Sequence, residues 1–349
     1  MTATLWPDAI GRLLRREDLP VDVVERAMST ILAGEATDAQ IAGFAVALRA
    51  KGETPAELAT LVRTMLSFAE RVDLSGLDRP PIDTCGTGGD RAGTVNVSTM
   101  AALVAAAAGA PVAKHGGRAA SSQCGSTDVL EALGVVIDLG PVGVARCVRE
   151  AGIGFCFAQR FHSAMRFAAP VRRELGTPTT FNFLGPLANP AGVRHQVIGV
   201  SDPAMAERVV GALAELGSER ALVFYGHDGL DELTVTTTSS VHELRNGEVR
   251  VFDVDPADYG IPYAEHGAFA GGDAAGNADV VHKTFAGASG PIRDIVALNA
   301  AAALSVADLV DDLGDGVQLA RAILDDGRAA ATLDAFVRVS VAAREAGEA

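Results

Sequence analysis

The chain has 349 residues, of which 48% are hydrophobic and 21% charged, and its 29 basic and 44 acidic side chains give a net charge of -15. This apolar content supplies a core of ordinary size and excludes disordered and collagen-like chains. A charge of -15 disfavours nucleic acid and anionic membranes as partners, because both are polyanions.

The four cysteines follow no pattern typical of metal or disulfide sites. Cys85, Cys124, Cys147 and Cys156 form no C-x-x-C pair and have no paired histidine ligands. Reduced thiols favour a cytoplasmic protein. The longest apolar stretch, 100–113, is too short and too interrupted by glycine and proline to span a bilayer, and the N-terminal residues do not resemble an export signal.

The first 75 or so residues predict helices with explicit start signals. Thr37 with Gln40, and again Thr54 with Glu57, form capping boxes in front of apolar residues at helical spacing. We therefore expect a small helical domain over residues 1–75.

From residue 76 to 349 the pattern changes to short apolar strands, Gly-rich turns and Ala-rich helices. This alternation predicts a large α/β domain with a mainly parallel central sheet. An Asn-Gly pair at 246–247 predicts a β-hairpin. The expected strands are 111–113, 135–139, 154–157, 196–200, 220–225, 240–244 and 249–254.

A Gly-rich motif at 83–90, Asp-Thr-Cys-Gly-Thr-Gly-Gly-Asp, leads through the polar segment 94–99 into an Ala-rich helix. A short strand, a glycine loop and a polar helix start leave backbone N–H groups free to face an anion, and the helix dipole favours negative charge. Phosphate is the natural ligand. The motif matches neither Walker A nor the dinucleotide fingerprint, and a tight loop that only needs positive φ is the alternative interpretation.

A second loop starts with Lys-His-Gly-Gly-Arg at 114–118 and runs through Ser121 and Ser122 into a helix. Lys114 follows an apolar strand, where its point charge can meet a phosphate. The alternatives are a solvated strand end for Lys114 and a structural ion pair for Arg118. Two loops of this type indicate a polyphosphate ligand.

Two further segments carry charged groups. If 171–176 is helical, Arg172 and Arg173 point in different directions, so one can enter a site and hold a carboxylate; a surface ion pair is the alternative. Asp231 and Glu232 follow an expected strand, and adjacent carboxylates there suit Mg²⁺ shared with substrate phosphates. The alternative for this acidic pair is simple solvation.

Together these motifs resemble the anthranilate phosphoribosyltransferase family, in the class of phosphoribosyltransferases related to pyrimidine nucleoside phosphorylases. The resemblance implies transfer of the phosphoribosyl group from phosphoribosyl pyrophosphate to the amine of anthranilate, with release of pyrophosphate, in tryptophan biosynthesis. It implies Mg²⁺ as cofactor, a homodimer formed through the helical domain, and a later contribution to that domain near 176–195. Further segments that carry the resemblance are 182–190, 271–273, 277–278, 290–294 and 298–301.

The resemblance also implies roles for individual residues. The residues implied to bind the donor are Gly86, Thr87, Gly89, Asp90, Thr94, Asn96, Ser98, Thr99, Lys114 and Ser126. Those implied to line the path and site of the acceptor are His115, Gly117, His162 and Arg172. Those implied to hold Mg²⁺, partly through water, are Ser98, Asp231 and Glu232. No single catalytic base is assigned, because an arylamine is already neutral at pH 7 and positioning should dominate.

The chain departs from the family pattern on the acceptor side. Gly117 stands where the family motif Lys-His-Gly-Asn-Arg has asparagine, and Gln159 and Ser163 stand where the family usually has prolines. The alternative is therefore a transferase that uses the same donor with a different aromatic or benzoate-like acceptor. A nucleoside phosphorylase is disfavoured by the paired Asp231 and Glu232, and a nucleic-acid binder by the lack of a basic run.

Overall fold

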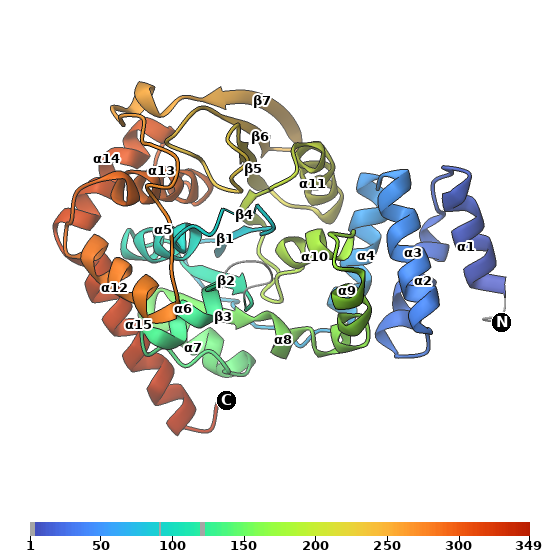
Figure 1. The fold of residues 1–349 in the computed structure, drawn as a ribbon. Helices are drawn as coiled ribbons and strands as arrows, with labels where there is room; N and C mark the ends of the chain where they lie inside the picture. The colour runs from blue at the N-terminus through green and yellow to red at the C-terminus, as the bar shows by residue number, and fades with distance from the viewer. Residues whose placement is uncertain (1–3, 91, 119–122) are drawn as a thin grey trace.

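The computed structural model describes residues 4–90, 92–118 and 123–349, so the predicted loop serines Ser121 and Ser122 lie outside the described residues. A group of N-terminal helices stands beside a sheet that is flanked by further helices (Figure 1). The described helices are α1 (Leu5–Leu14), α2 (Val21–Leu32), α3 (Asp38–Lys51), α4 (Pro55–Ser67), α5 (Val97–Ala107), α6 (Ser126–Ala132), α7 (Pro141–Ala151), α8 (Ala158–Phe161), α9 (Ala169–Leu175), α10 (Phe181–Leu187), α11 (Pro203–Leu216), α12 (Ala274–Phe285), α13 (Pro291–Val306), α14 (Leu313–Asp325) and α15 (Arg328–Glu345), with 3₁₀ turns η2 (Ser163–Phe167) and η3 (Pro256–Tyr259). The strands are β1 (Ile82–Gly86), β2 (Val112–Gly116), β3 (Ile153–Phe157), β4 (His195–Gly199), β5 (Arg220–Gly226), β6 (Ser239–Arg245) and β7 (Glu248–Val254).

The capping boxes form as the sequence predicts. The Thr37 hydroxyl accepts from the backbone N–H of Gln40, and the Gln40 side chain accepts from the N–H of Thr37. Thr54 and Glu57 make the same reciprocal pair at the start of α4. Each box satisfies two N–H groups that a helix start otherwise leaves without partners, which is why these helices begin where they do.

The sheet has the order β3-β2-β1-β4-β5-β6-β7, with the first five strands parallel and the last two antiparallel. This confirms the α/β class and the mainly parallel sheet. The hairpin between β6 and β7 is also confirmed, because Asn246 and Gly247 take the left-handed conformation that its tight turn requires, with φ of 54° and 81°. The winding direction reverses between β1 and β4, and ligands of such sheets bind at the carboxyl ends of the strands at this point.

The strand expected at 135–139 is wrong. This segment has no regular secondary structure; it buries Val135, Ile137 and Leu139 alternately, but it pairs with no strand of the sheet. Instead the backbone N–H of Val136 donates to the hydroxyl of Ser340 in α15 at 3.0 Å. Alternating burial therefore arises here because the segment packs against α15. A segment packed in this way can have the same two-residue burial period as a strand.

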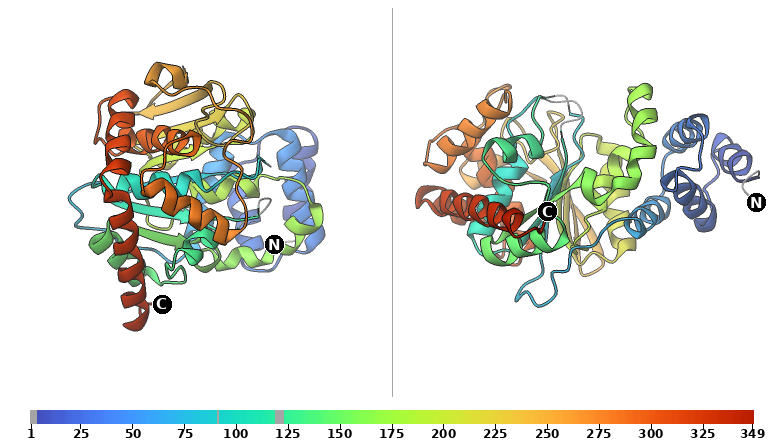
Figure 2. Two further views of the ribbon diagram at one scale, coloured as in Figure 1. Left: turned by 60° about the vertical axis from the view of Figure 1, so that its left-hand side comes forward. Right: turned by 90° about the horizontal axis from the view of Figure 1, so that it is seen from below.

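Two cores hold the molecule together, one on each face of the sheet. One core joins strand residues such as Val197 and Leu222 to α5, α7, α13 and α15. The other joins the opposite strand faces, including Ile198 and Val223, to α11, α10, α9 and the N-terminal helices α1–α4. Seen from below, α1–α3 lie at one end of the molecule and α12–α15 at the other, with the sheet between them (Figure 2). None of the described helices combines the length and apolar composition needed to cross a membrane.

Candidate active site

The carboxyl ends of β1 and β2, together with the loop after β5, form the floor of the site. Strands β1, β2, β4 and β5 each end in glycine, and at all four positions a Cβ atom would come closer than 3.0 Å to a neighbouring atom. A Cβ atom on Gly86 or Gly199 would overlap Asp231, at its carboxylate and at its backbone carbonyl respectively. The loop that carries Asp231 and Glu232 therefore lies directly on the strand ends.

A cavity of about 290 Å³ opens above this floor, and we call it the donor cavity. The structure brings to its wall every residue for which the resemblance implies donor or metal binding: Gly86, Thr87, Gly89, Asp90, Thr94, Asn96, Ser98, Thr99, Lys114, Ser126, Asp231 and Glu232. They come from the loop after β1, the start of α5, the end of β2, the start of α6 and the loop after β5. Segments far apart in the sequence thus line the same donor cavity.

The hydrogen bonds in the donor cavity differ from the expectation of open backbone N–H groups. The N–H of Gly88 donates to Asp231 Oδ2 at 2.7 Å, and the N–H of Ser98 at the start of α5 donates to Glu232 Oε1 at 3.1 Å. Two carboxylates thus occupy positions suited to an anion. The physical reason is that a partly buried carboxylate takes the nearest N–H donors when it has no other partner.

Lys114 lies deeper than a solvated strand end. Its side chain is buried, and Nζ donates to the carbonyl of Thr84 at 2.5 Å and approaches the Ser98 hydroxyl at 3.4 Å. Burial lowers the pKa of this ammonium, opposed by the charge of Asp83. Arg118 instead makes the structural ion pairs of its alternative interpretation, with Asp128 and Glu131 at 2.7 Å each.

Burial and neighbouring negative charges disfavour the ionised forms of Asp231 and Glu232 when no cation is bound. Burial, followed by the neighbouring charge of Asp90, raises the pKa of Asp231 to about 7. Burial and the charge of Asp231 raise the pKa of Glu232 as well. The described part of the chain holds no group of three or more histidine, cysteine or acidic side chains that could enclose a metal. Two carboxylates with room for water and substrate oxygens match the ligand preference of Mg²⁺.

A second cavity of about 440 Å³, the acceptor cavity, lies between β2, α8, α9 and α10. All four residues implied to line the acceptor path lie on its wall, together with the two departures from the family pattern: His115, Gly117, Gln159, His162, Ser163 and Arg172. The helical prediction for 171–176 holds, since α9 ends at Leu175, and it turns Arg172 toward the cavity while Arg173 is exposed. Within the described structure the side chain of Arg172 makes no ion pair or hydrogen bond, and burial lowers the pKa of its guanidinium.

The two cavities share a wall made of His115, Gly117 and Arg118. Ligands bound in the two cavities would therefore meet at the end of β2. A Cβ atom at Gly117 would lie 3.7 Å from both Ala158 Cβ and Gln159 Oε1, which is ordinary contact. Packing thus does not require glycine here, and the missing side chain leaves the shared wall open.

Sequence reasoning missed the buried support behind the shared wall. Asp83 accepts from the backbone N–H of His115 at 3.0 Å and from the side-chain amide of Asn189 at 2.8 Å. Asn96 lies on the wall of the donor cavity, and its side-chain carbonyl accepts from the side-chain amide of Asn277 at 2.9 Å. Asn189 lies in 182–190, one of the segments that carry the resemblance, but no local pattern marks it as a partner of β1.

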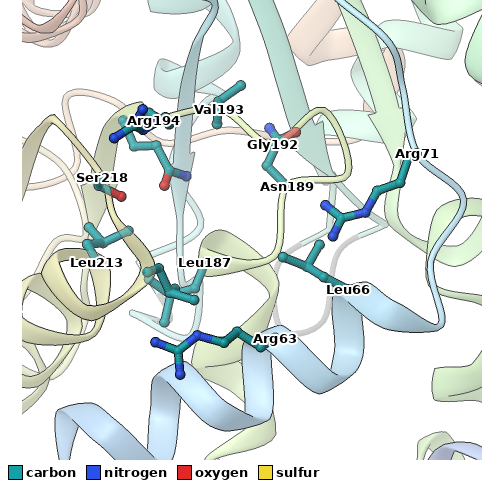
Figure 3. A pocket seen from close by; sticks show the side chains of 12 residues that line it. Arg63, Leu66, Arg71, Leu187, Asn189, Gly192, Val193, Arg194, Leu213 and Ser218 are labelled. Atoms are coloured by element: carbon teal, nitrogen blue, oxygen red, sulfur yellow. The ribbon is translucent and has the colours of Figure 1, made fainter.

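A third cavity, of about 360 Å³, lies at the opposite end of β4, and its lining includes Arg63, Arg71 and Arg194 (Figure 3). Arg63 donates to the carbonyl of Glu215 at 2.6 Å and Arg194 to that of Gly217 at 2.8 Å. These arginines thus satisfy carbonyls at the C-terminal end of α11. No motif predicted this cavity, and none of the residues that line the donor or acceptor cavity lines it.

Two family models match this chain. Residues 7–69 match the family model described as "Glycosyl transferase family, helical bundle domain", and residues 78–330 match "Glycosyl transferase family, a/b domain". These matches define the class as a glycosyl transferase with a helical and an α/β part.

Named relatives define the family within this class. The anthranilate phosphoribosyltransferase of Nocardioides sp. is 54% identical over 95% of this chain and 98% of its own length. The crystal structure of the Thermus thermophilus anthranilate phosphoribosyltransferase superposes with a TM-score of 0.90 at 41% identity, over 96% of this chain and 99% of that one. The Saccharomyces cerevisiae enzyme, solved in complex with phosphoribosyl pyrophosphate and Mg, has a TM-score of 0.88 at 26% identity, over 98% and 99% of the two chains. The chain belongs to the anthranilate phosphoribosyltransferase family, which confirms the resemblance seen in the sequence.

Proposed function

We propose that the donor and acceptor cavities carry out the reaction for which the family is named. The enzyme transfers the phosphoribosyl group of phosphoribosyl pyrophosphate to the amine of anthranilate, depends on Mg²⁺ and releases pyrophosphate. The observation that carries the assignment of cavities is their shared wall at the end of β2. It allows the two substrates to meet between a phosphate-type loop and an unpaired arginine.

On the donor side, the loop after β1 and the starts of α5 and α6 would hold the phosphates and ribose. When bound, Mg²⁺ neutralises pyrophosphate charge, and Ser98, Asp231 and Glu232 are the residues that would hold it, partly through water. The N–H groups of Gly88 and Ser98 donate to these two carboxylates, and they would be free to donate to phosphate oxygens if the carboxylates turned toward a cation. Lys114 fixes the cavity floor through Thr84 and adds positive charge near the leaving group.

On the acceptor side, Arg172 would hold the carboxylate of anthranilate, because a guanidinium binds a carboxylate through two parallel hydrogen bonds. His115, His162 and Gly117 would surround the aromatic amine. The amine nitrogen attacks ribose C1, the bond from C1 to the pyrophosphate oxygen breaks, and the leaving group takes the electron pair. The nitrogen is then a secondary ammonium, and it loses one proton to water or to the departing pyrophosphate to become the secondary amine of the product. Holding both reactants in line supplies most of the rate enhancement.

Two finer proposals concern assembly and location. Leu14, Val21 and Val46 are large apolar side chains exposed on the N-terminal helices, at 74%, 56% and 43%. We propose that they contribute to a homodimer formed through the helical domain, which sedimentation of the wild type and of Val46→Glu would test. The four buried thiols suit a reducing compartment such as the cytoplasm.

The experiment that tests the function is pyrophosphate release from phosphoribosyl pyrophosphate and Mg²⁺, with anthranilate compared against other amino- and hydroxybenzoates. Efficient turnover of anthranilate above the other acceptors is the expected result, and it would make Gly117, Gln159 and Ser163 tolerated variations. Turnover of another acceptor without anthranilate would contradict the assignment and show that these residues re-specify the cavity.

A further inference from the structure

The third cavity, at the opposite end of β4 from the candidate active site, combines apolar walls with positive charge (Figure 3). Its volume of about 360 Å³ falls within the roughly 300 to 1,000 Å³ typical of small-molecule sites. Among the described residues that line it, none is acidic, whereas five are large apolar residues and three are arginines: Leu66, Leu187, Val193, Leu213, Leu216, Arg63, Arg71 and Arg194. In a chain with 44 acidic and 29 basic side chains, a cavity wall of this composition is suited to an anion.

Arg71 is the cation on this wall that lacks a partner. It lies in the segment between α4 and β1, its side chain is exposed, and within the described structure it makes no hydrogen bond or ion pair. Figure 3 shows its guanidinium pointing toward Leu66 and the loop that carries Asn189 and Gly192. A guanidinium presents several N–H donors in a planar fork that matches an acid group. Arg71 can therefore bind the acid group of a ligand without giving up another contact.

Arg63 and Arg194 keep N–H donors besides those that they use on the end of α11. Arg63 donates through Nη2 to one carbonyl at 2.6 Å, and Arg194 donates through Nε to another at 2.8 Å. Arg194 Nη1 also pairs with Glu219 at 2.7 Å, whereas the nearest carboxylate oxygen to Arg63, on Glu215, lies 4.0 Å away. These two arginines thus add charge around the opening, and the acid group of a ligand is best placed on Arg71.

The apolar part of the wall comes from helices on both sides of the cavity. Leu66 belongs to α4, Leu187 to α10, and Leu213 and Leu216 to α11. Leu66 and Leu216 are only half-buried. An apolar ligand body placed against them would remove their remaining surface from water, which an inorganic ion would not do. The wall therefore favours an anion that carries an apolar body.

We propose that the third cavity is a binding site for a small organic acid, with the acid group on Arg71 and the apolar body against the leucines of α4, α10 and α11. The inference goes beyond the proposed function and does not depend on it. Asn189 lines the same cavity, and its side-chain amide donates to Asp83 at 2.8 Å and to the carbonyl of Ala113 at 2.7 Å. A ligand in the third cavity would therefore lie against the buried support of the wall that the donor and acceptor cavities share.

Ligand-detected NMR titrations with hexanoate, acetate and 1-hexanol separate the two parts of the proposed ligand. Acetate keeps the charge without the apolar chain, and 1-hexanol keeps the chain without the charge. The titrations use Arg172→Gln protein, because Arg172 in the acceptor cavity is the competing site for a carboxylate. We expect hexanoate to bind this protein roughly tenfold or more tightly than either of the other two probes.

A pair of further substitutions in the same protein locates the site. Arg71→Gln should weaken hexanoate binding about tenfold, because it removes a charge-assisted contact, and should leave 1-hexanol binding unchanged. Arg79→Gln is the matched control, since Arg79 is also exposed between α4 and β1 but does not line the cavity. Saturating hexanoate should also raise the thermal midpoint, and Arg71→Gln should abolish most of that rise.

Absence of hexanoate binding, or equal affinity for hexanoate in the Arg71→Gln and Arg79→Gln proteins, would overturn the inference. Equal affinity for hexanoate and acetate would overturn the apolar part of the site. Neither substitution should shift the thermal midpoint without ligand, because both side chains are exposed, so a loss of binding can be assigned to the site and not to misfolding.

Discussion

Arg172 and Arg173 are adjacent in α9, yet only Arg172 lies on the wall of the acceptor cavity. Neighbouring positions on a helix point about 100° apart, so one can be half-buried in a cavity while the other is solvated. A guanidinium that is partly desolvated and has no described partner has much to gain from a carboxylate ligand. A substitution of Arg173 is therefore a matched control for the same substitution of Arg172.

We expect Arg172→Gln to raise KM for anthranilate roughly 30-fold, because a charge-assisted bidentate contact contributes about 2 kcal/mol. KM for phosphoribosyl pyrophosphate should not change. Steady-state kinetics with each substrate varied in turn would measure both constants. Arg173→Gln is the matched control and should behave as the wild type. An equal effect of the two substitutions would argue against a role for Arg172 in binding the acceptor.

The acidic pair gives a second prediction at the residue scale. Asp231→Asn removes one of two carboxylates proposed to hold Mg²⁺, so the Mg²⁺ concentration at half-maximal activity should rise about tenfold or more. Asp279→Asn, at an exposed surface ion pair with Lys283, is the control with the same change of charge. Titration of activity with Mg²⁺ would measure this, and an unchanged midpoint for Asp231→Asn would place the metal elsewhere.

At the scale of elements, the site depends on how closely the loop after β5 lies on the strand ends. Gly199 at the end of β4 is fully enclosed there, because a Cβ atom would overlap the backbone carbonyl of Asp231. Backbone atoms cannot rotate away as a side chain can. The loop and the strand end therefore have to move together.

We expect Gly199→Ala to lower the free energy of unfolding by about 3 kcal/mol and to weaken Mg²⁺ binding, because overpacking displaces the loop that carries the acidic pair. Gly272→Ala is the matched control, since a Cβ atom there meets no heavy atom within 4 Å. Denaturant unfolding of both variants would measure the difference. Equal stability of the two would show that the loop after β5 adapts freely.

The sequence predicted those features of the fold that depend on residues close together in the chain. The capping boxes, the parallel strands and the hairpin at Asn246 depend on neighbouring residues, so they could be read from the sequence. The segment 135–139 could not, because its two-residue period does not reveal whether another strand or α15 lies beside it. The division of the chain into residues 1–75 and 76–349 stays a prediction.

In the candidate site, too, the residues within motifs could be predicted and the long-range contacts could not. The donor and acceptor residues could be collected from motifs because each motif lies at a strand end or a helix start. The contacts of Asp83 with Asn189 and of His115 with Gly185 could not be predicted. They join positions far apart in the chain, and the motifs that contain Asp83 and His115 do not reveal these partners. The roles of the individual site residues stay predictions until the variants are measured.

For the whole molecule, the buried imidazoles of His115 and His162 make stability depend on pH. Burial holds their folded pKa values at about 3 and about 4, whereas in the unfolded chain a histidine titrates near pH 6.5. Below that pH the unfolded chain binds protons that the folded chain does not, so stability falls as pH falls. Between pH 6.5 and pH 5 each histidine should cost about 2 kcal/mol.

Denaturant unfolding at pH 7.5 and pH 5 would measure this dependence. Other groups also titrate in this range, so the informative quantity is the difference between the wild type and a His115→Asn, His162→Gln double variant. We expect the double variant to lose less stability than the wild type on acidification. An identical loss in both proteins would show that the folded rings take up protons as readily as the unfolded chain.

The core shared by α1–α4 with α9 and α10 has a consequence for synthesis of the protein. Buried residues of the first helices, such as Leu58 and Leu61, share this core with Phe181 and Leu184, which leave the ribosome well over a hundred residues later. Until then the early helices lack part of their apolar cover. We therefore expect the nascent N-terminal helices to become stable only after the chain has been synthesised to about residue 188. Before that point we expect chaperones to bind them preferentially.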